Sequence, residues 1–166
     1  MPGYINIDIR PGPAVDQVAD ARDLPWPDNS LDEIYACALL EHLGRHEWRA
    51  ALAHWHAKLK PNGLLRVSVP DFRAICEWYL QTHSFNHLLG LVIGGQRDEY
   101  DYHKMIFDFN LLAEGLRMAG FHNIRRYDWR DTVVGDLDID DFSQAYLPHM
   151  DKEYGHLMVL NVEARA

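Results

Sequence analysis

The stretch that decides the fold runs from Leu31 to Val69: LDEIYACALLEHLGRHEWRAALAHWHAKLKPNGLLRVSV. Its first eight residues, 31–38, end in an apolar run typical of a buried strand, and residues 64–69 (LLRVSV) predict a second strand. Between them, apolar residues recur at spacings of four, three and four, as on one face of a helix: Trp48, Leu52, Trp55 and Leu59. Because a helix over 46–59 can serve as the crossover, we expect 31–38 and 64–69 to be adjacent parallel strands.

Further strand-like and helix-like segments lie on both sides of this stretch. The expected strands are 4–9, 15–19, 123–129 and 156–164. Apolar spacing predicts a helix after Pro70 and another over 108–119, which Gly120 would end in a left-handed conformation. Strands that alternate with helices predict an α/β fold with a mainly parallel sheet covered on both faces. No helix is expected between the last two strands, so we predict an antiparallel pair at the C-terminal end of the sheet.

Composition limits the class of protein. A chain of 166 residues fits one domain, and we expect residues 1–166 to form it. The net charge of −9 argues against nucleic acid as a partner, because affinity for phosphates comes mainly from Lys and Arg. No apolar run of about 20 residues and no signal peptide is present, so we expect a cytoplasmic protein with no membrane partner. The two cysteines, Cys37 and Cys76, lie in apolar segments, and we expect buried, reduced thiols.

Four segments in this order resemble the class I S-adenosylmethionine-dependent methyltransferases, and specifically a small bacterial branch of that family. They are INIDI (5–9), VADARDLPWPDNSLDEIYACALLEHL (18–43), LKPNGLLRVSVPDF (59–72) and LAEGLRMAGFHNI (112–124). The resemblance extends from about Tyr4 to Val162. It implies a Rossmann-like methyltransferase fold and S-adenosylmethionine as the cofactor.

The resemblance also implies a set of cofactor-binding residues at the ends of strands. Asp8 would end the second strand of the family sheet and accept hydrogen bonds from both ribose hydroxyls, which suits a carboxylate with two acceptor oxygens. Asp20 would end the third strand and bind the adenine amino group, beside a backbone N–H of Ala21. The full expected set is Asp8, Ile9, Asp20, Ala21, Cys37, Ala38, Leu40 and His42.

Other polar residues have competing structural interpretations. Asp71 precedes an expected helix and fits an N-cap better than a catalyst. His42 and His46 lie four residues apart, but the chain has no HExxH pattern, so we predict no metal site. Tyr100, Tyr102 and His103 lie in a tyrosine-rich loop and are candidates for substrate contact, although a packed surface loop explains them equally well.

The largest departure from the family pattern lies at the N-terminus. In the family, a first strand and its glycine-rich loop precede the segment that INIDI resembles, and this strand lies between the second and fourth strands of the sheet. Here only residues 1–3 precede Tyr4, so we expect an N-terminally truncated form of the fold. The remaining strands could close the gap, a second chain could cover it, or the chain could be a shortened form of a longer protein.

Two functions from different classes remain open at this stage. The first is a methyltransferase that acts on a small molecule, since methyl transfer depends mainly on positioning and needs no conspicuous catalytic residue. The second is a methyltransferase-like protein without this activity, which serves as a binding or assembly subunit. Because uncovered strand edges favour association, we also expect a homodimer whose interface includes the first forty residues.

Overall fold

The core of the protein is a four-stranded mixed sheet with the strand order β3-β4-β8-β5. Its strands are β3 (Leu31–Cys37), β4 (Leu59–Pro70), β8 (Val159–Arg165) and β5 (His122–Arg126). The structure is a computed structural model that describes Met1 and residues 3–166. Strands β3 and β4 pair in parallel, and β8 pairs antiparallel with both β4 and β5. The predicted parallel neighbours and the predicted antiparallel end are both confirmed.

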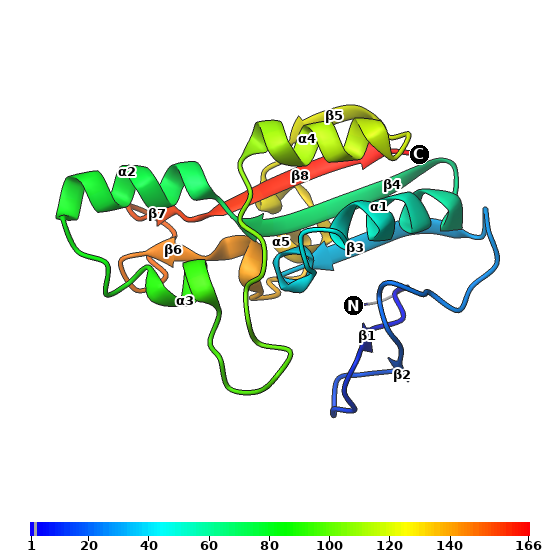
Figure 1. Ribbon diagram of the computed structural model, residues 1–166, viewed down its shortest axis with the longest axis horizontal. Coiled ribbons are helices and arrows are strands. Elements are labelled where there is room, and N and C mark those ends of the chain that lie inside the picture. The colour runs from blue at the N-terminus through cyan, green and yellow to red at the C-terminus, as the bar shows by residue number, and fades with distance from the viewer. Residues whose placement is uncertain (2) are drawn as a thin grey trace.

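One face of this sheet is covered by α1 (Trp48–Lys58) and α4 (Phe109–Met118), which lie side by side in Figure 1. The predicted apolar face of α1 is fully buried in the main core, including Trp48 and Leu52. Gly115 of α4 lies against the Trp48 ring so closely that a Cβ there would overlap it. Close packing of these two helices therefore depends on a residue without a side chain.

The opposite face of the sheet is polar and is also covered, as expected, but the sheet is mixed rather than mainly parallel, because β8 pairs antiparallel with both neighbours. Arg66 of β4 forms ion pairs with Glu33 (2.7 Å) and Glu163 (3.3 Å). Tyr35 donates a hydrogen bond to Asp141 (2.6 Å). The cover on this side is the irregular segment 127–145. It contains the short elements η2 (Trp129–Asp131), α5 (Val133–Asp136) and η3 (Phe142–Gln144), and Figure 1 shows α5 behind the sheet.

Beyond the C-terminal end of β4 lies a smaller cluster of elements. These are α2 (Phe72–Thr82), α3 (Leu89–Ile93), β6 (Tyr146–Leu147) and β7 (His156–Leu157). The predicted N-cap of α2 is confirmed, because the Asp71 carboxylate accepts a hydrogen bond from the Arg73 N–H at 3.0 Å. No helix among the described residues is long and apolar enough to cross a membrane.

The N-terminal segment forms a separate parallel pair, β1 (Ile7–Asp8) and β2 (Gln17–Val18), which lies apart from β3 in Figure 1. Within the described residues no strand lies between β1 and β3, so the remaining strands do not close the gap. Helix α1 holds this segment in place instead. The Trp55 indole donates to the Ala21 carbonyl (2.7 Å), and the Leu24 N–H donates to His54 (2.8 Å).

Candidate functional site

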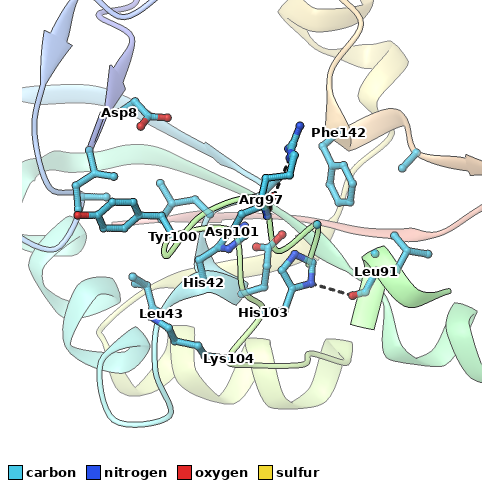
Figure 2. A pocket seen from close by; sticks show the side chains of 18 of the residues that line it. Asp8, His42, Leu43, Leu91, Arg97, Tyr100, Asp101, His103, Lys104 and Phe142 are labelled. Carbon is cyan, nitrogen blue, oxygen red and sulfur yellow. Dashed lines mark hydrogen bonds and ion pairs between the residues drawn. The ribbon is translucent and has the colours of Figure 1, made fainter. Parts of the chain in front are cut away.

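A cavity of about 850 Å³ lies between the β1–β2 segment, the C-terminal end of β3, the loop 94–104 and the segment 142–150 (Figure 2). The structure brings most of the expected site residues to it. Those that line the cavity are Asp8, Ile9, Asp20, Ala21, Ala38, His42 and His103. Residues that lie up to 95 positions apart in the sequence therefore share one enclosed space, and the carboxyl ends of three strands open into it.

Three expected residues do not line this cavity. Leu40, in the short helix η1 (Leu40–His42), is fully buried in the hydrophobic core. Cys37 lies near Tyr35 and Asp141 on the polar side of the sheet, and burial raises the pKa of its thiol to about 12. The side chain of Tyr102 is largely exposed, and only its carbonyl contacts the site, through His42. These placements correct the roles expected for Cys37, Leu40 and Tyr102.

Asp8 and Asp20 have different environments, although both end short parallel strands. One oxygen of Asp8 accepts the N–H of Arg10 at 2.8 Å, and no other described residue donates a hydrogen bond to this carboxylate. Both oxygens of Asp20 are engaged by the Arg22 guanidinium, at 3.0 and 2.6 Å. Hydrogen bonding to Arg22 also lowers the pKa of Asp20. Asp8 is therefore the more available acceptor for a ligand.

Ala38 brings backbone to the cavity in an uncommon conformation. Its φ of +50° lies in the left-handed region, which costs a residue with a Cβ about 1–2 kcal/mol. The Ala38 N–H is fixed by a hydrogen bond to the Ser68 carbonyl at 2.9 Å. Such strained positions persist only where the surroundings hold them, and they cluster at ligand sites. The hydrogen bond to Ser68 thus holds the turn after β3 in this conformation, where Ala38 lines the cavity.

Glu41 also lines the cavity and is absent from the expected site residues. It is fully buried, neither carboxylate oxygen has a hydrogen-bond partner among the described residues, and burial raises its pKa to about 8. Burial likewise lowers the pKa of His103, whose ring lies 4.8 Å from that of His42. The available sequence signal was an acidic residue inside the otherwise apolar run ALLEHL, since buried carboxylates are rare without a partner.

The loop 94–104 supplies the candidate Tyr100 and two further lining residues that sequence reasoning missed, Arg97 and Asp101. Arg97 and Asp101 form an ion pair at 2.9 Å (Figure 2). The loop begins at Gly94, whose φ is +78° and where a Cβ would overlap the Asp101 carbonyl. Gly94 therefore permits the loop to fold back on itself beside the cavity.

Comparisons with known proteins connect this geometry to a family. Residues 6–67 match the family model described as a methyltransferase domain. A methyltransferase structure from Burkholderia thailandensis, with bound 1,6-didemethyltoxoflavin and S-adenosylhomocysteine, matches with a TM-score of 0.55. The chain has the class I methyltransferase fold. The predicted α/β, Rossmann-like architecture is thereby confirmed, and over residues 6–67 the family match agrees with the resemblance seen in the sequence.

The similarity to solved methyltransferases is structural rather than close in sequence. The Burkholderia thailandensis enzyme is 17% identical, over 96% of this chain and 59% of its own. A methyltransferase from Thermotoga maritima is 17% identical over 89% and 61%, with a TM-score of 0.54. One from Archaeoglobus fulgidus is 14% identical over 89% and 66%, with a TM-score of 0.52. The chain thus spans about three fifths to two thirds of the length of these methyltransferases. No curated protein matches it.

Proposed function

We propose that this protein binds S-adenosylmethionine in the cavity and transfers its methyl group to a small molecule. The observation that carries this proposal is the convergence of Asp8, Asp20 and Ala38, from the ends of β1, β2 and β3, on one cavity. Open α/β sheets bind ligands outside the carboxyl ends of their strands. The family match over residues 6–67, which contain all three residues, supports the same function.

The residues present fit the cofactor's adenosine half. The second oxygen of the Asp8 carboxylate is available to a ribose hydroxyl, and Arg10 holds the first oxygen in place. Both oxygens of Asp20 already accept hydrogen bonds from Arg22. In this proposal an Asp20 oxygen accepts a further hydrogen bond, from the adenine amino group. Ala38 presents backbone to the methionine half. When bound, the cofactor supplies an electrophilic methyl group, and the protein contributes mainly the alignment of that group with the acceptor.

The methyl acceptor is a small molecule in this proposal. A cavity of about 850 Å³ falls within the range of small-molecule sites, about 300–1,000 Å³. The loop 94–104 lines the cavity with Tyr100 and His103 among its residues, and its Asp98 forms an ion pair with Arg10 beside Asp8. We place the acceptor beside this loop. The expected contact with His103 fits this position, whereas Tyr102 reaches the site only through its carbonyl.

Calorimetry with S-adenosylmethionine and S-adenosylhomocysteine tests the proposal on wild type and Asp8→Ala. Loss of charge-assisted hydrogen bonds to ribose should weaken binding by about 2–4 kcal/mol in the variant. Asp32→Ala is the matched control, because Asp32 pairs with Lys60 at the far end of β3. Equal affinity in wild type and Asp8→Ala, or no binding by wild type, would contradict the proposal.

A second function remains a candidate because the described residues place no strand between β1 and β3. In this alternative the protein is methyltransferase-like, binds its ligand without turnover and serves as a binding or assembly subunit. Assays of methyl transfer across a panel of small acceptors distinguish the two. Tight binding of S-adenosylhomocysteine with no transfer to any acceptor would favour the alternative. As part of the proposal, we place the protein in the cytoplasm, where its two free thiols, Cys37 and Cys76, stay reduced.

A further inference from the structure

We propose that Glu41, His42 and His103 bind a divalent transition-metal ion at the side of the cavity. One ligand atom from each residue lies within 4.8 Å of the other two. The three side chains come from η1 and from the loop 94–104, two segments about 60 residues apart. This site goes beyond the proposed function, because binding of a metal ion here requires neither S-adenosylmethionine nor a methyl acceptor.

The Glu41 carboxylate is the first argument for a cation. Its side chain is fully buried and lines the cavity, yet no described residue donates a hydrogen bond to either oxygen. Leaving a buried polar group without a partner is costly, so buried carboxylates are normally paired with a charge or bound to a metal. No Lys or Arg side chain among the described residues forms an ion pair with it.

The two histidines are held in the form that binds metals. Nδ1 of His42 lies 3.2 Å from the Tyr102 carbonyl, and Nδ1 of His103 lies 3.0 Å from the Leu91 carbonyl, the bond drawn in Figure 2. Because a carbonyl oxygen can only accept, Nδ1 carries the proton in each ring, and Nε2 keeps its lone pair. Metal-binding histidines characteristically donate their other ring N–H to a backbone carbonyl or carboxylate in this way.

Backbone hydrogen bonds fix the two segments to each other. The N–H groups of Lys104 and Met105 both donate to the Glu41 carbonyl, at 2.8 and 3.0 Å. The His103 N–H donates to the Ile93 carbonyl at 3.2 Å. His103 is therefore held beside Glu41 and His42 by the main chain. Precise placement of ligand side chains by their surroundings is what a metal site requires.

The ligand set indicates the class of metal. Imidazole ligands suit Zn²⁺, Fe²⁺ and related ions, whereas Mg²⁺ and Ca²⁺ prefer oxygen ligands. Metal–nitrogen bonds of about 2.0–2.1 Å bring ligand atoms roughly 3–3.5 Å apart, so small side-chain rotations would close the three residues around an ion. Three protein ligands leave at least one coordination position for water or a bound molecule, which here faces the cavity.

Zn²⁺ titration by calorimetry tests the site on metal-free protein, and the visible absorption of Co²⁺ reports its ligands. We expect one ion per chain, and at least a tenfold loss of affinity in both Glu41→Gln and His103→Ala. His46→Ala is the matched control, since His46 is exposed and lies four residues from His42. Thermal melting checks that each variant is folded. Glu41→Gln keeps the size of the side chain and replaces the carboxyl group with an amide, which cannot supply an anionic ligand.

Two results would overturn the metal site. One is the absence of saturable binding of a single Zn²⁺ ion by the wild-type chain. The other is a folded Glu41→Gln variant with wild-type affinity and an unchanged Co²⁺ spectrum, because an ion bound elsewhere would not depend on Glu41. Binding of Zn²⁺ in the absence of S-adenosylmethionine would support the site whether or not the cofactor binds.

Discussion

Asp8 and Asp20 show what a sequence can and cannot say about single residues. Their positions after apolar strand-like runs, together with the family resemblance, were enough to place both at one cavity. The sequence did not reveal that Arg22 occupies both oxygens of Asp20, since that pairing depends on side-chain geometry. The same limit explains why Glu41 was missed. The run ALLEHL hinted at a buried acid, but the hydrogen bonds from Lys104 and Met105 to the Glu41 carbonyl join segments about 60 residues apart, which no local pattern encodes.

The Asp20–Arg22 pair leads to a prediction about pH. Because Arg22 lowers the folded-state pKa of Asp20, the pair stabilises the fold above the ordinary Asp pKa of about 3.9. This contribution is lost as the pH falls through the lowered pKa. We expect Arg22→Ala to raise the pKa of Asp20 toward its ordinary value, as measured by NMR titration of its carboxyl carbon. An unchanged pKa in that variant would show that Arg22 does not hold the carboxylate in solution.

At the scale of elements, the predictions were most accurate for segments that pair within the four-stranded sheet. The strand 31–38 and the following helix were predicted to within two residues, whereas the strand predicted over 64–69 begins five residues earlier, at Leu59. By contrast, longer strands were expected over 4–9 and 15–19. In each of them the paired strand covers just two residues, Ile7–Asp8 and Gln17–Val18. An alternating run such as YINIDI predicts strand conformation, but its paired length depends on neighbours, and β1 pairs only with β2 among the described residues.

The contact between α1 and α4 gives a prediction for stability. A Cβ at Gly115 would overlap the fully buried Trp48 ring, so Gly115→Ala should lower the free energy of unfolding by about 1–3 kcal/mol in urea denaturation. Gly90→Ala in α3 is the control, because a Cβ there meets no atom within 4 Å. That change should leave stability unchanged or raise it by up to about 1 kcal/mol. Equal stability of the two variants would mean that the helices do not pack this closely.

At the scale of the whole molecule, the α/β class and the antiparallel end of the sheet followed from the order of local patterns. The difference between the two faces of the sheet did not follow from these patterns: one face is covered by α1 and α4, the other by the irregular segment 127–145. The sequence is acidic around residues 136–141, yet the segment 127–145 packs on the sheet through Tyr35–Asp141 and through Asn161, which donates to the Ser143 carbonyl at 2.9 Å. The cavity was also beyond sequence patterns alone, because four segments distant along the chain enclose it.

The proposal at the scale of the whole molecule is that two copies of the chain associate. Among the residues that the structure describes, strand β3 pairs on one side, with β4, and a free edge presents unpaired backbone groups to a partner. We propose a homodimer that uses residues from the first forty positions and buries at least about 1,000 Å² in total. Light scattering at micromolar concentration should give about twice the chain mass of 19.3 kDa. A mass equal to that of one chain would contradict the dimer.

The most direct test of the account is an NMR titration of the isotope-labelled chain with S-adenosylhomocysteine, followed through assigned backbone amides. If the cavity between β1–β2 and β3 is the cofactor site, saturable shifts should concentrate at residues 7–10, 19–22, 38–39 and 41–43, the parts of these segments that line it. Amides of β5 and α4, which lie away from the cavity, should change little. Saturable shifts confined to another surface, or no shifts at millimolar ligand, would contradict the assignment of this cavity to the cofactor.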